Sequence, residues 1–191
     1  MSAFALIMLA PLFGMIALAI RIKDPGPVFF AHRRIGREGK WFGCLKFRSM
    51  VIDAEFRLAA VLDNDSDAAA EWRDSQKLRK DPRVTGLGRF LRRSSLDELP
   101  QLLNVFRGEM SIVGPRPIVA DEIARYGEDF AAYCSVRPGI TGAAQISGRT
   151  DLAYKDRVRI DTDYIARKSL LVDLLIVVKT VPHVMTGKGA V

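Results

Sequence analysis

Residues 92–104 read RRSSLDELPQLLN, so two arginines, two adjacent carboxylates and the start of an apolar pattern fall within thirteen positions. The apolar residues that recur from here at helical spacing are Leu99, Leu102, Leu103 and Phe106. This spacing predicts a helix that buries one side against the rest of the chain. Asp97 and Glu98 are therefore expected at the amino end of that helix.

Two interpretations of this carboxylate pair are open. Ser95 and Glu98 fit a capping box, in which the side chains only satisfy free backbone N–H groups of the helix. Pro100 argues against a regular helix start, because proline lacks an N–H and disfavours α geometry at Leu99. The second interpretation is an irregular turn that presents Asp97 and Glu98 for chemistry.

Length and charge set the frame for the whole chain. Its 191 residues suit one domain, and 29 basic against 22 acidic residues give a formal net charge of +7. A basic balance favours partners such as phosphates, nucleic acid or anionic lipid. Cys44 and Cys134 are far apart in sequence, which predicts neither a zinc site nor a disulfide framework and fits a reducing cytosol.

The amino-terminal segment is the strongest membrane signal. Residues 2–20 carry no charge, and as a helix they would extend roughly 29 Å, close to the hydrocarbon thickness of a bilayer. Arg21 and Lys23 follow, which places the remaining chain on the cytoplasmic side. Pro11 predicts a break, so the segment is either re-entrant or spanning. We expect a membrane-associated helix over residues 1–22 and a single cytoplasmic domain over residues 23–191.

The remaining pattern predicts an α+β fold that is predominantly helical, with a small β-hairpin. The hairpin strands are expected at residues 28–30 and 41–50, with Lys46 and Arg48 on one face. The other expected elements are a helix at 51–62, a glycine-containing loop at 85–89, strands at 110–113 and 143–146, and helices at 151–168 and 169–185. The last of these is either core or an amphipathic element in the membrane surface.

Arginines recur in rigid turns. Arg116 stands between two prolines in Gly114-Pro115-Arg116-Pro117, and Arg149 follows Gly148. A fixed backbone that presents a guanidinium fork suits a phosphate oxygen, while a structural arginine that binds carbonyl groups is the equal alternative.

Four motifs in order give the chain a family resemblance. They are Lys46-Phe47-Arg48-Ser49-Met50, Ser95-Leu96-Asp97-Glu98-Leu99-Pro100-Gln101-Leu102, Gly114-Pro115-Arg116-Pro117 and Arg137-Pro138-Gly139-Ile140-Thr141-Gly142. With these motifs the chain resembles the bacterial sugar transferases, and within them the monotopic polyprenyl-phosphate phosphoglycosyl transferases. The resemblance extends from the apolar segment to Gly187-Lys188-Gly189.

The resemblance implies an activity. It is the transfer of a sugar phosphate from a UDP-sugar to undecaprenyl phosphate, with release of UMP, as the first step of surface-glycan biosynthesis. It also implies Mg²⁺ as cofactor, Asp97 as the nucleophile that forms an aspartyl-phosphosugar intermediate, and Glu98 as the metal ligand. A carboxylate is ionised at neutral pH and needs no base to attack phosphorus.

The resemblance extends to further residues and to location. Phosphate-binding positions of the family fall on Lys46, Arg92, Arg116 and Arg149, and a further carboxylate near the site falls on Asp161. The implied location is the bacterial inner membrane, with the catalytic domain on the cytoplasmic face and membrane lipid as a partner. The entry segment that precedes the membrane helix in the family is absent, so the chain either begins late or belongs to a larger protein.

A non-catalytic alternative also fits the composition. A basic membrane-surface adaptor would bind anionic lipid or nucleic acid, but it gives no reason for an acidic pair beside arginines. Phe29, Phe30 and Trp41 are interpreted as core or interface anchors and not as bases' stacking partners, so no nucleic acid is expected. A homo-oligomer stays open, since an exposed apolar face could meet the membrane or a second copy.

Overall fold

The computed structural model describes residues 2–75, 78, 81–148 and 152–186. Its helices are α1 (Ser2–Lys23), α2 (Ala54–Asn64), α3 (Ser66–Ser75), α4 (Gly86–Arg93), α5 (Gln101–Phe106), α6 (Ile123–Tyr126), α7 (Phe130–Cys134), α8 (Ala143–Ser147), α9 (Tyr154–Arg167) and α10 (Leu170–Thr186). The strands are β1 (Phe29–Ile35), β2 (Trp41–Phe47), β3 (Ser111–Val113) and β4 (Gly139–Thr141). The described residues also form the 3-10 turns η1 (Arg37–Gly39), η2 (Leu96–Glu98), η3 (Ala120–Glu122) and η4 (Gly127–Asp129). The predicted fold class, predominantly helical with a small hairpin, is confirmed.

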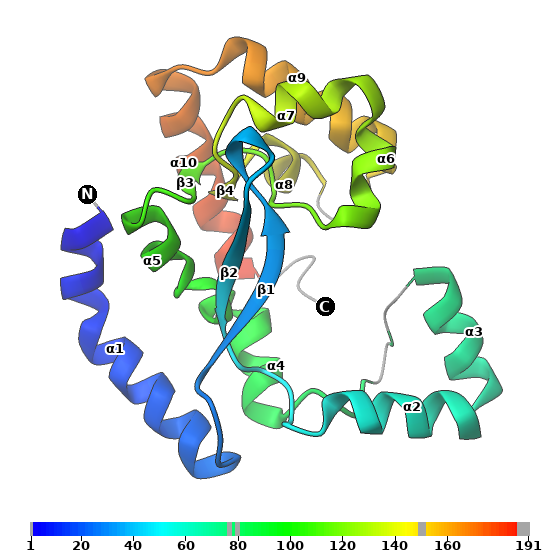
Figure 1. The fold of residues 1–191 in the computed structure, drawn as a ribbon. Helices are drawn as coiled ribbons and strands as arrows, with labels where there is room; N and C mark the ends of the chain where they lie inside the picture. The colour runs from blue at the N-terminus through cyan, green and yellow to red at the C-terminus, as the bar shows by residue number, and fades with distance from the viewer. Residues whose placement is uncertain (1, 76–77, 79–80, 149–151, 187–191) are drawn as a thin grey trace.

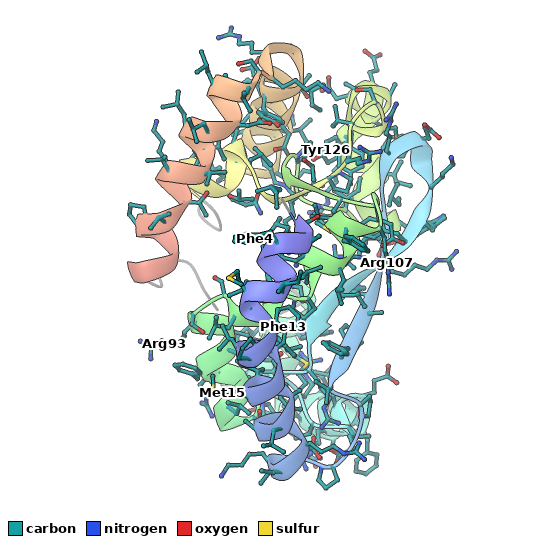
Figure 2. The ribbon with its side chains drawn as sticks, turned by 90° about the vertical axis from the view of Figure 1, so that its left-hand side faces the viewer. Phe4, Phe13, Met15, Arg93, Arg107 and Tyr126 are labelled. Carbon is teal, nitrogen blue, oxygen red and sulfur yellow. The ribbon has the colours of Figure 1, made fainter. Side chains whose placement is uncertain are left out.

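Helix α1 is long and apolar enough to cross a membrane, with a mean hydropathy of 2.5 over an 18-residue window. It stays helical through Pro11, so the break expected there is not an interruption of the helix, and its course through a membrane stays a prediction. One side of α1 buries Ile16 and Ile20 against Phe47 and Leu91. Figure 2 views the molecule from the side on which α1 lies in front.

The β1–β2 hairpin runs through the middle of the molecule (Figure 1). The strands pair antiparallel, with Phe29 opposite Phe47 and Ile35 opposite Trp41. β2 ends at Phe47, and so Arg48 lies beyond the strand, where its guanidinium approaches the Asp24 carboxylate at 3.5 Å. The expectation that Lys46 and Arg48 share one face of a strand is therefore wrong, because the strand ends between them.

A second sheet joins distant parts of the chain. β3 and β4 pair in parallel, with Ser111 opposite Gly139 and Val113 opposite Thr141. β4 falls within the motif at residues 137–142, for which no strand is predicted, and residues 143–146, expected as a strand, form helix α8. Strand β4 forms because β3 supplies its parallel partner, and local sequence patterns carry no information about such a partner.

Helix α10 has one buried and one exposed side. Ile176 packs with Val113 and Tyr164, and Tyr164 donates a 2.7 Å hydrogen bond to Asp173, which satisfies this carboxylate within an apolar helix. The exposed apolar side chains of α10 are Leu170, Leu171, Leu174, Leu175, Val177, Val178 and Val181. α10 is thus core on one side only. Helices α2 and α3 extend away from the other elements (Figure 1).

Candidate active site

The 3-10 turn η2 carries the two carboxylates. Ser95, which precedes it, lies in the left-handed region at φ 55° and ψ 16°, and its side chain caps no backbone N–H. The capping-box interpretation is therefore wrong, and the irregular turn is confirmed. Leu99 keeps helical angles of φ −52° and ψ −36°, so the expected distortion before Pro100 is found at Ser95 instead. Such a conformation costs a non-glycine residue about 1–3 kcal/mol and is typical of functional sites.

Lys46 reaches both carboxylates from strand β2. Its Nζ lies 2.7 Å from Glu98 Oε1 and 3.9 Å from Asp97 Oδ2. Asp97 is only 7% exposed, and burial raises its pKa to about 6. Lys46 and Arg92 act against this rise, and Glu98 adds to it. Asp97 is thus a buried carboxylate whose ionised form depends on neighbouring cations.

Arg92 lies in the last turn of α4, where its charge acts on Asp97. Its Nε donates a 2.9 Å hydrogen bond to Ser49 Oγ, and burial lowers its pKa while the charge of Asp97 raises it. Residues 85–89 do not form the expected loop: Thr85 caps α4 by accepting from Gly88 N–H at 2.8 Å. A Cβ on Gly88 would lie 1.9 Å from the Ser49 carbonyl oxygen. Gly88 therefore permits the close approach that brings Arg92 to Ser49.

Asn104 joins the helix after the carboxylates to the strand that carries Lys46. It is fully buried, accepts from Leu45 N–H at 3.0 Å, and donates to the Gly43 carbonyl at 2.8 Å and to Glu109 at 2.7 Å. Its carboxamide thus occupies the edge of β2 as the peptide group of a third strand would. No local pattern in the sequence distinguishes this asparagine, because its partners on β2, Leu45 and Gly43, lie about 60 positions away along the chain.

The structure does not join the other predicted site residues to the carboxylate pair through any contact between described residues. Arg116 is exposed and makes no hydrogen bond or ion pair with the described residues, whereas Arg149 lies outside them. Asp161 is 1% exposed in α9, where it accepts a 2.9 Å hydrogen bond from the Tyr126 hydroxyl and lies 3.8 Å from Arg157. These contacts do not join it to Asp97 or Glu98.

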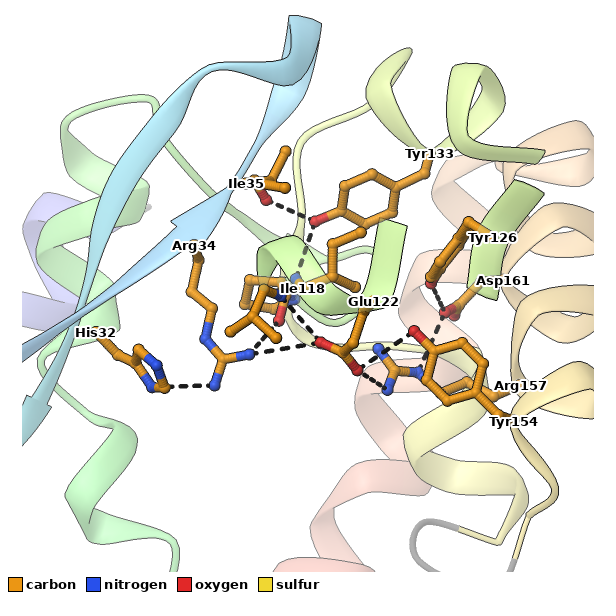
Figure 3. A network of polar contacts seen from close by, with 12 residues as sticks. His32, Arg34, Ile35, Ile118, Glu122, Tyr126, Tyr133, Tyr154, Arg157 and Asp161 are labelled. Carbon is orange, nitrogen blue, oxygen red and sulfur yellow. Dashed lines mark hydrogen bonds and ion pairs between the residues drawn. The ribbon is translucent and has the colours of Figure 1, made fainter. Parts of the chain in front are cut away.

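Asp161 belongs instead to a polar network that no sequence pattern predicts (Figure 3). Glu122 lies 3.7 Å from Arg34 of β1 and 3.2 Å from Arg157 of α9. Burial acts to raise the pKa of Glu122, but the Val119 N–H and the charges of the surrounding arginines lower it below its usual range. The network couples the hairpin to α9 beside Arg116.

The carboxylate pair suits the cofactor that the resemblance implies. Mg²⁺ is commonly bound through one or two carboxylates together with substrate phosphates. Glu98 supplies one such group beside Asp97, and the described residues contain no cluster of three or more His, Cys, Asp or Glu side chains that could hold a metal by themselves. The donor set therefore fits a metal that is shared with a phosphate substrate.

A buried carboxylate beside a lysine and an arginine, on a turn packed against a helix that is long and apolar enough to cross a membrane, is an arrangement that suits an enzyme with an anionic substrate. The family model for bacterial sugar transferases matches residues 1–187. The chain belongs to this family, which confirms the resemblance and sets aside the non-catalytic adaptor.

Curated relatives agree with this membership. The exopolysaccharide production protein ExoY of Rhizobium meliloti is 49% identical over 189 residues, which cover 99% of this chain and 84% of the relative. The undecaprenyl-phosphate galactose phosphotransferase of Salmonella typhimurium is 48% identical over 190 residues, 99% of this chain and 40% of the relative. The UDP-glucose:undecaprenyl-phosphate glucose-1-phosphate transferase of Escherichia coli is 40% identical over 198 residues, 100% of this chain and 39% of the relative.

Proposed function

We propose that this enzyme transfers a sugar phosphate from a UDP-sugar to undecaprenyl phosphate and releases UMP, with Asp97 as the covalent nucleophile. The observation that carries the proposal is the position of Asp97, buried and 3.9 Å from the Lys46 ammonium. Two of the relatives are named as undecaprenyl-phosphate sugar phosphotransferases, which supports the choice of substrates.

In the first half-reaction an Asp97 carboxylate oxygen attacks the phosphorus that bears the sugar. The bond from this phosphorus to the bridging oxygen breaks, and UMP leaves with the electron pair. With a pKa of about 6, Asp97 is mostly ionised at neutral pH, so no general base is required. Lys46 and Arg92 lower the repulsion between this anion and the diphosphate.

In the second half-reaction an oxygen of undecaprenyl phosphate attacks the same phosphorus. The acyl-phosphate bond to Asp97 breaks, which restores the carboxylate and gives undecaprenyl-diphosphate-sugar. We assign Glu98, together with the substrate phosphates, to hold Mg²⁺, whose contribution when bound is to neutralise phosphate charge. Glu98 would then exchange its 2.7 Å contact with Lys46 for the metal, which leaves the ammonium to the substrate.

The packing of α1 supports a lipid substrate. Leu96 and Leu99, which flank the carboxylates, pack against the cluster formed by α1 residues Ile16 and Ile20. The turn that carries the nucleophile thus packs against the apolar helix. A polyprenyl chain in the membrane could therefore bring its phosphate to Asp97. Arg21 and Lys23 at the end of α1 support a cytoplasmic face for the domain. The exposed apolar side of α10 supports a second contact with the membrane surface.

The test is UMP release from a panel of UDP-sugars by the full chain in lipid nanodiscs containing undecaprenyl phosphate. We expect Asp97→Asn to abolish both UMP release and a phosphosugar adduct detected by intact-protein mass spectrometry. Asp163→Asn, an exposed carboxylate on α9, is the matched control and should retain both. Full turnover by Asp97→Asn would contradict the assignment of the nucleophile.

A further inference from the structure

One face of the hairpin continues from Lys46 onto β1. The register places Phe30 opposite Lys46 and His32 opposite Cys44. Directly opposed residues share a face of an antiparallel pair, with Cβ atoms about 5 Å apart, and alternate residues share it along the strand. Phe30, His32 and Arg34 therefore form one row beside Lys46. Cys44 is covered by the core, whereas Phe30 is 54% exposed, so the β1 half of this face is open.

His32 has a defined hydrogen-bonding role on this face. Arg34 Nη2 lies 3.1 Å from His32 Nδ1 (Figure 3), and because a guanidinium only donates, Nδ1 must accept. The ring is therefore neutral with its proton on Nε2. Burial and the charges of Arg34, Lys46 and Arg116 all lower the pKa of His32, which maintains this neutral form at pH 7. Nε2–H makes no hydrogen bond with the described residues and can donate to a ligand.

We propose that Phe30 and His32 form the subsite for the nucleobase of the donor, with the base stacked on the Phe30 ring and one of its carbonyl oxygens accepting from His32 Nε2–H. The inference rests on the proposed function, since Lys46 would hold the diphosphate to which the nucleoside is joined. A pyrimidine offers both a π-face and carbonyl acceptors. The rings of Phe30 and His32 lie 6.0 Å apart and are tilted by 56°, so one face and one edge of a base can be contacted from this row.

The surroundings of Phe30 favour a nucleobase over a lipid chain. Phe29 lies on the opposite face, where it stacks on Phe47 with ring centroids 5.4 Å apart, and Phe47 contacts Phe13 of α1 at 5.3 Å. That face is the side of the hairpin that contacts α1 near Phe29. Phe30 instead stands beside Lys46, and the charge of Arg116 reaches its neighbour His32. An acyl chain gains nothing from such cations, whereas a nucleotide does.

Calorimetry on the full chain in nanodiscs separates the base from the phosphate. UMP and ribose 5-phosphate are the probes, because the second lacks the base. We expect Phe30→Ala and Phe30→Leu to weaken UMP binding about 5- to 100-fold and to leave ribose 5-phosphate binding unchanged, while Phe30→Tyr retains UMP affinity. His32→Phe should weaken UMP binding about tenfold, and His32→Gln, which keeps a donor, should restore most of it.

Trp41→Leu is the matched control, since Trp41 is 45% exposed on the opposite face of the hairpin, where Arg33 lies 4.5 Å from its ring. It should leave the affinity for UMP unchanged. Equal weakening of both probes by Phe30→Leu, or unchanged UMP affinity, would overturn the subsite. The subsite would also be overturned if Phe30→Leu weakened only the binding of vesicles or only the binding of UDP-sugar, because Phe30 would then contact lipid or the sugar. UMP binding that depends on Phe30 in a protein without turnover would support the subsite while contradicting the proposed function.

Discussion

The Lys46 ammonium lies 2.7 Å from Glu98 and holds this carboxylate at the side of Asp97. Strand β2 and turn η2, which carry these residues, are about 50 positions apart in sequence. A lysine between two adjacent carboxylates makes their ionisation interdependent, because each charge alters the free energy of the others. Lys46 therefore has two expected roles, the control of Asp97 and the binding of phosphate.

Lys46→Gln should move the acidic limb of the pH profile for UMP release to higher pH by about one unit. Lys46 lowers the pKa of Asp97 from what burial alone would give, and without this cation the nucleophile ionises only at higher pH. The measurement is the rate of UMP release as a function of pH between about pH 5 and about pH 9. Lys40→Gln, which changes an exposed lysine paired with Glu38, is the control. An unmoved limb in Lys46→Gln would contradict the coupling.

Asp97→Asn should stabilise the protein while it removes activity. Burial raises the pKa of Asp97 from 3.8 to about 6, so the folded state binds the proton more tightly than the unfolded state. The free energy of unfolding therefore falls as the pH rises from about 4 to about 6, and the loss persists above that range. We expect the variant to gain about 2–3 kcal/mol at pH 8 and nothing below about pH 4. Thermal unfolding at the two pH values measures it, and a lower Tm than wild type at pH 8 would refute it.

Asn104→Ala should cost about 2–4 kcal/mol of stability. It leaves the Gly43 carbonyl and the Leu45 N–H without their side-chain partners in a buried position. Asn104→Asp should also be destabilised, because the carboxylate can still accept from Leu45 but cannot donate to Gly43. Denaturant unfolding provides the measurement. Asn64→Ala, at an exposed position of α2, should change stability by less than about 0.5 kcal/mol. An Asn104→Ala variant with the stability of wild type would show that water replaces the amide without cost.

Gly88→Ala and Gly86→Ala form a matched pair within α4. A Cβ at position 88 would collide with the Ser49 carbonyl, whereas one at position 86 meets nothing within 4 Å. We expect Gly88→Ala to lower stability by about 1–3 kcal/mol and to reduce UMP release, since α4 must shift and Arg92 loses Ser49. Gly86→Ala should be neutral or stabilising by up to about 1 kcal/mol. Equal effects of the two variants would argue against close packing at Gly88.

Much of the fold follows from local patterns. The hairpin, the helix after the carboxylates, and α9 and α10 form where the sequence predicts them. Apolar spacing is the signal for the helix after the carboxylates, since burial of one face imposes a period on the sequence. In α5, however, Phe106 is 62% exposed and Asn104 is buried. Two of the exceptions are β4, which a strand from elsewhere in the chain completes, and the start of α4 after Thr85. In both cases the local pattern suggests a turn because it contains glycines, whereas in the structure these glycines allow distant segments of the chain to pack closely.

The sequence by itself determined the family, the apolar amino-terminal helix and the position of the carboxylate pair directly before a second helix, because these depend on neighbouring residues and on motifs in order. It left open whether the pair lies in a capping box or in an irregular turn. Only the tertiary structure decided what surrounds the pair. It placed Lys46 against Glu98, brought Arg92 to Ser49, set Asn104 at the edge of β2 and put Asp161 against Tyr126. These contacts join residues that are far apart along the chain. Their partners are set by how the elements pack, so no local pattern could have named them.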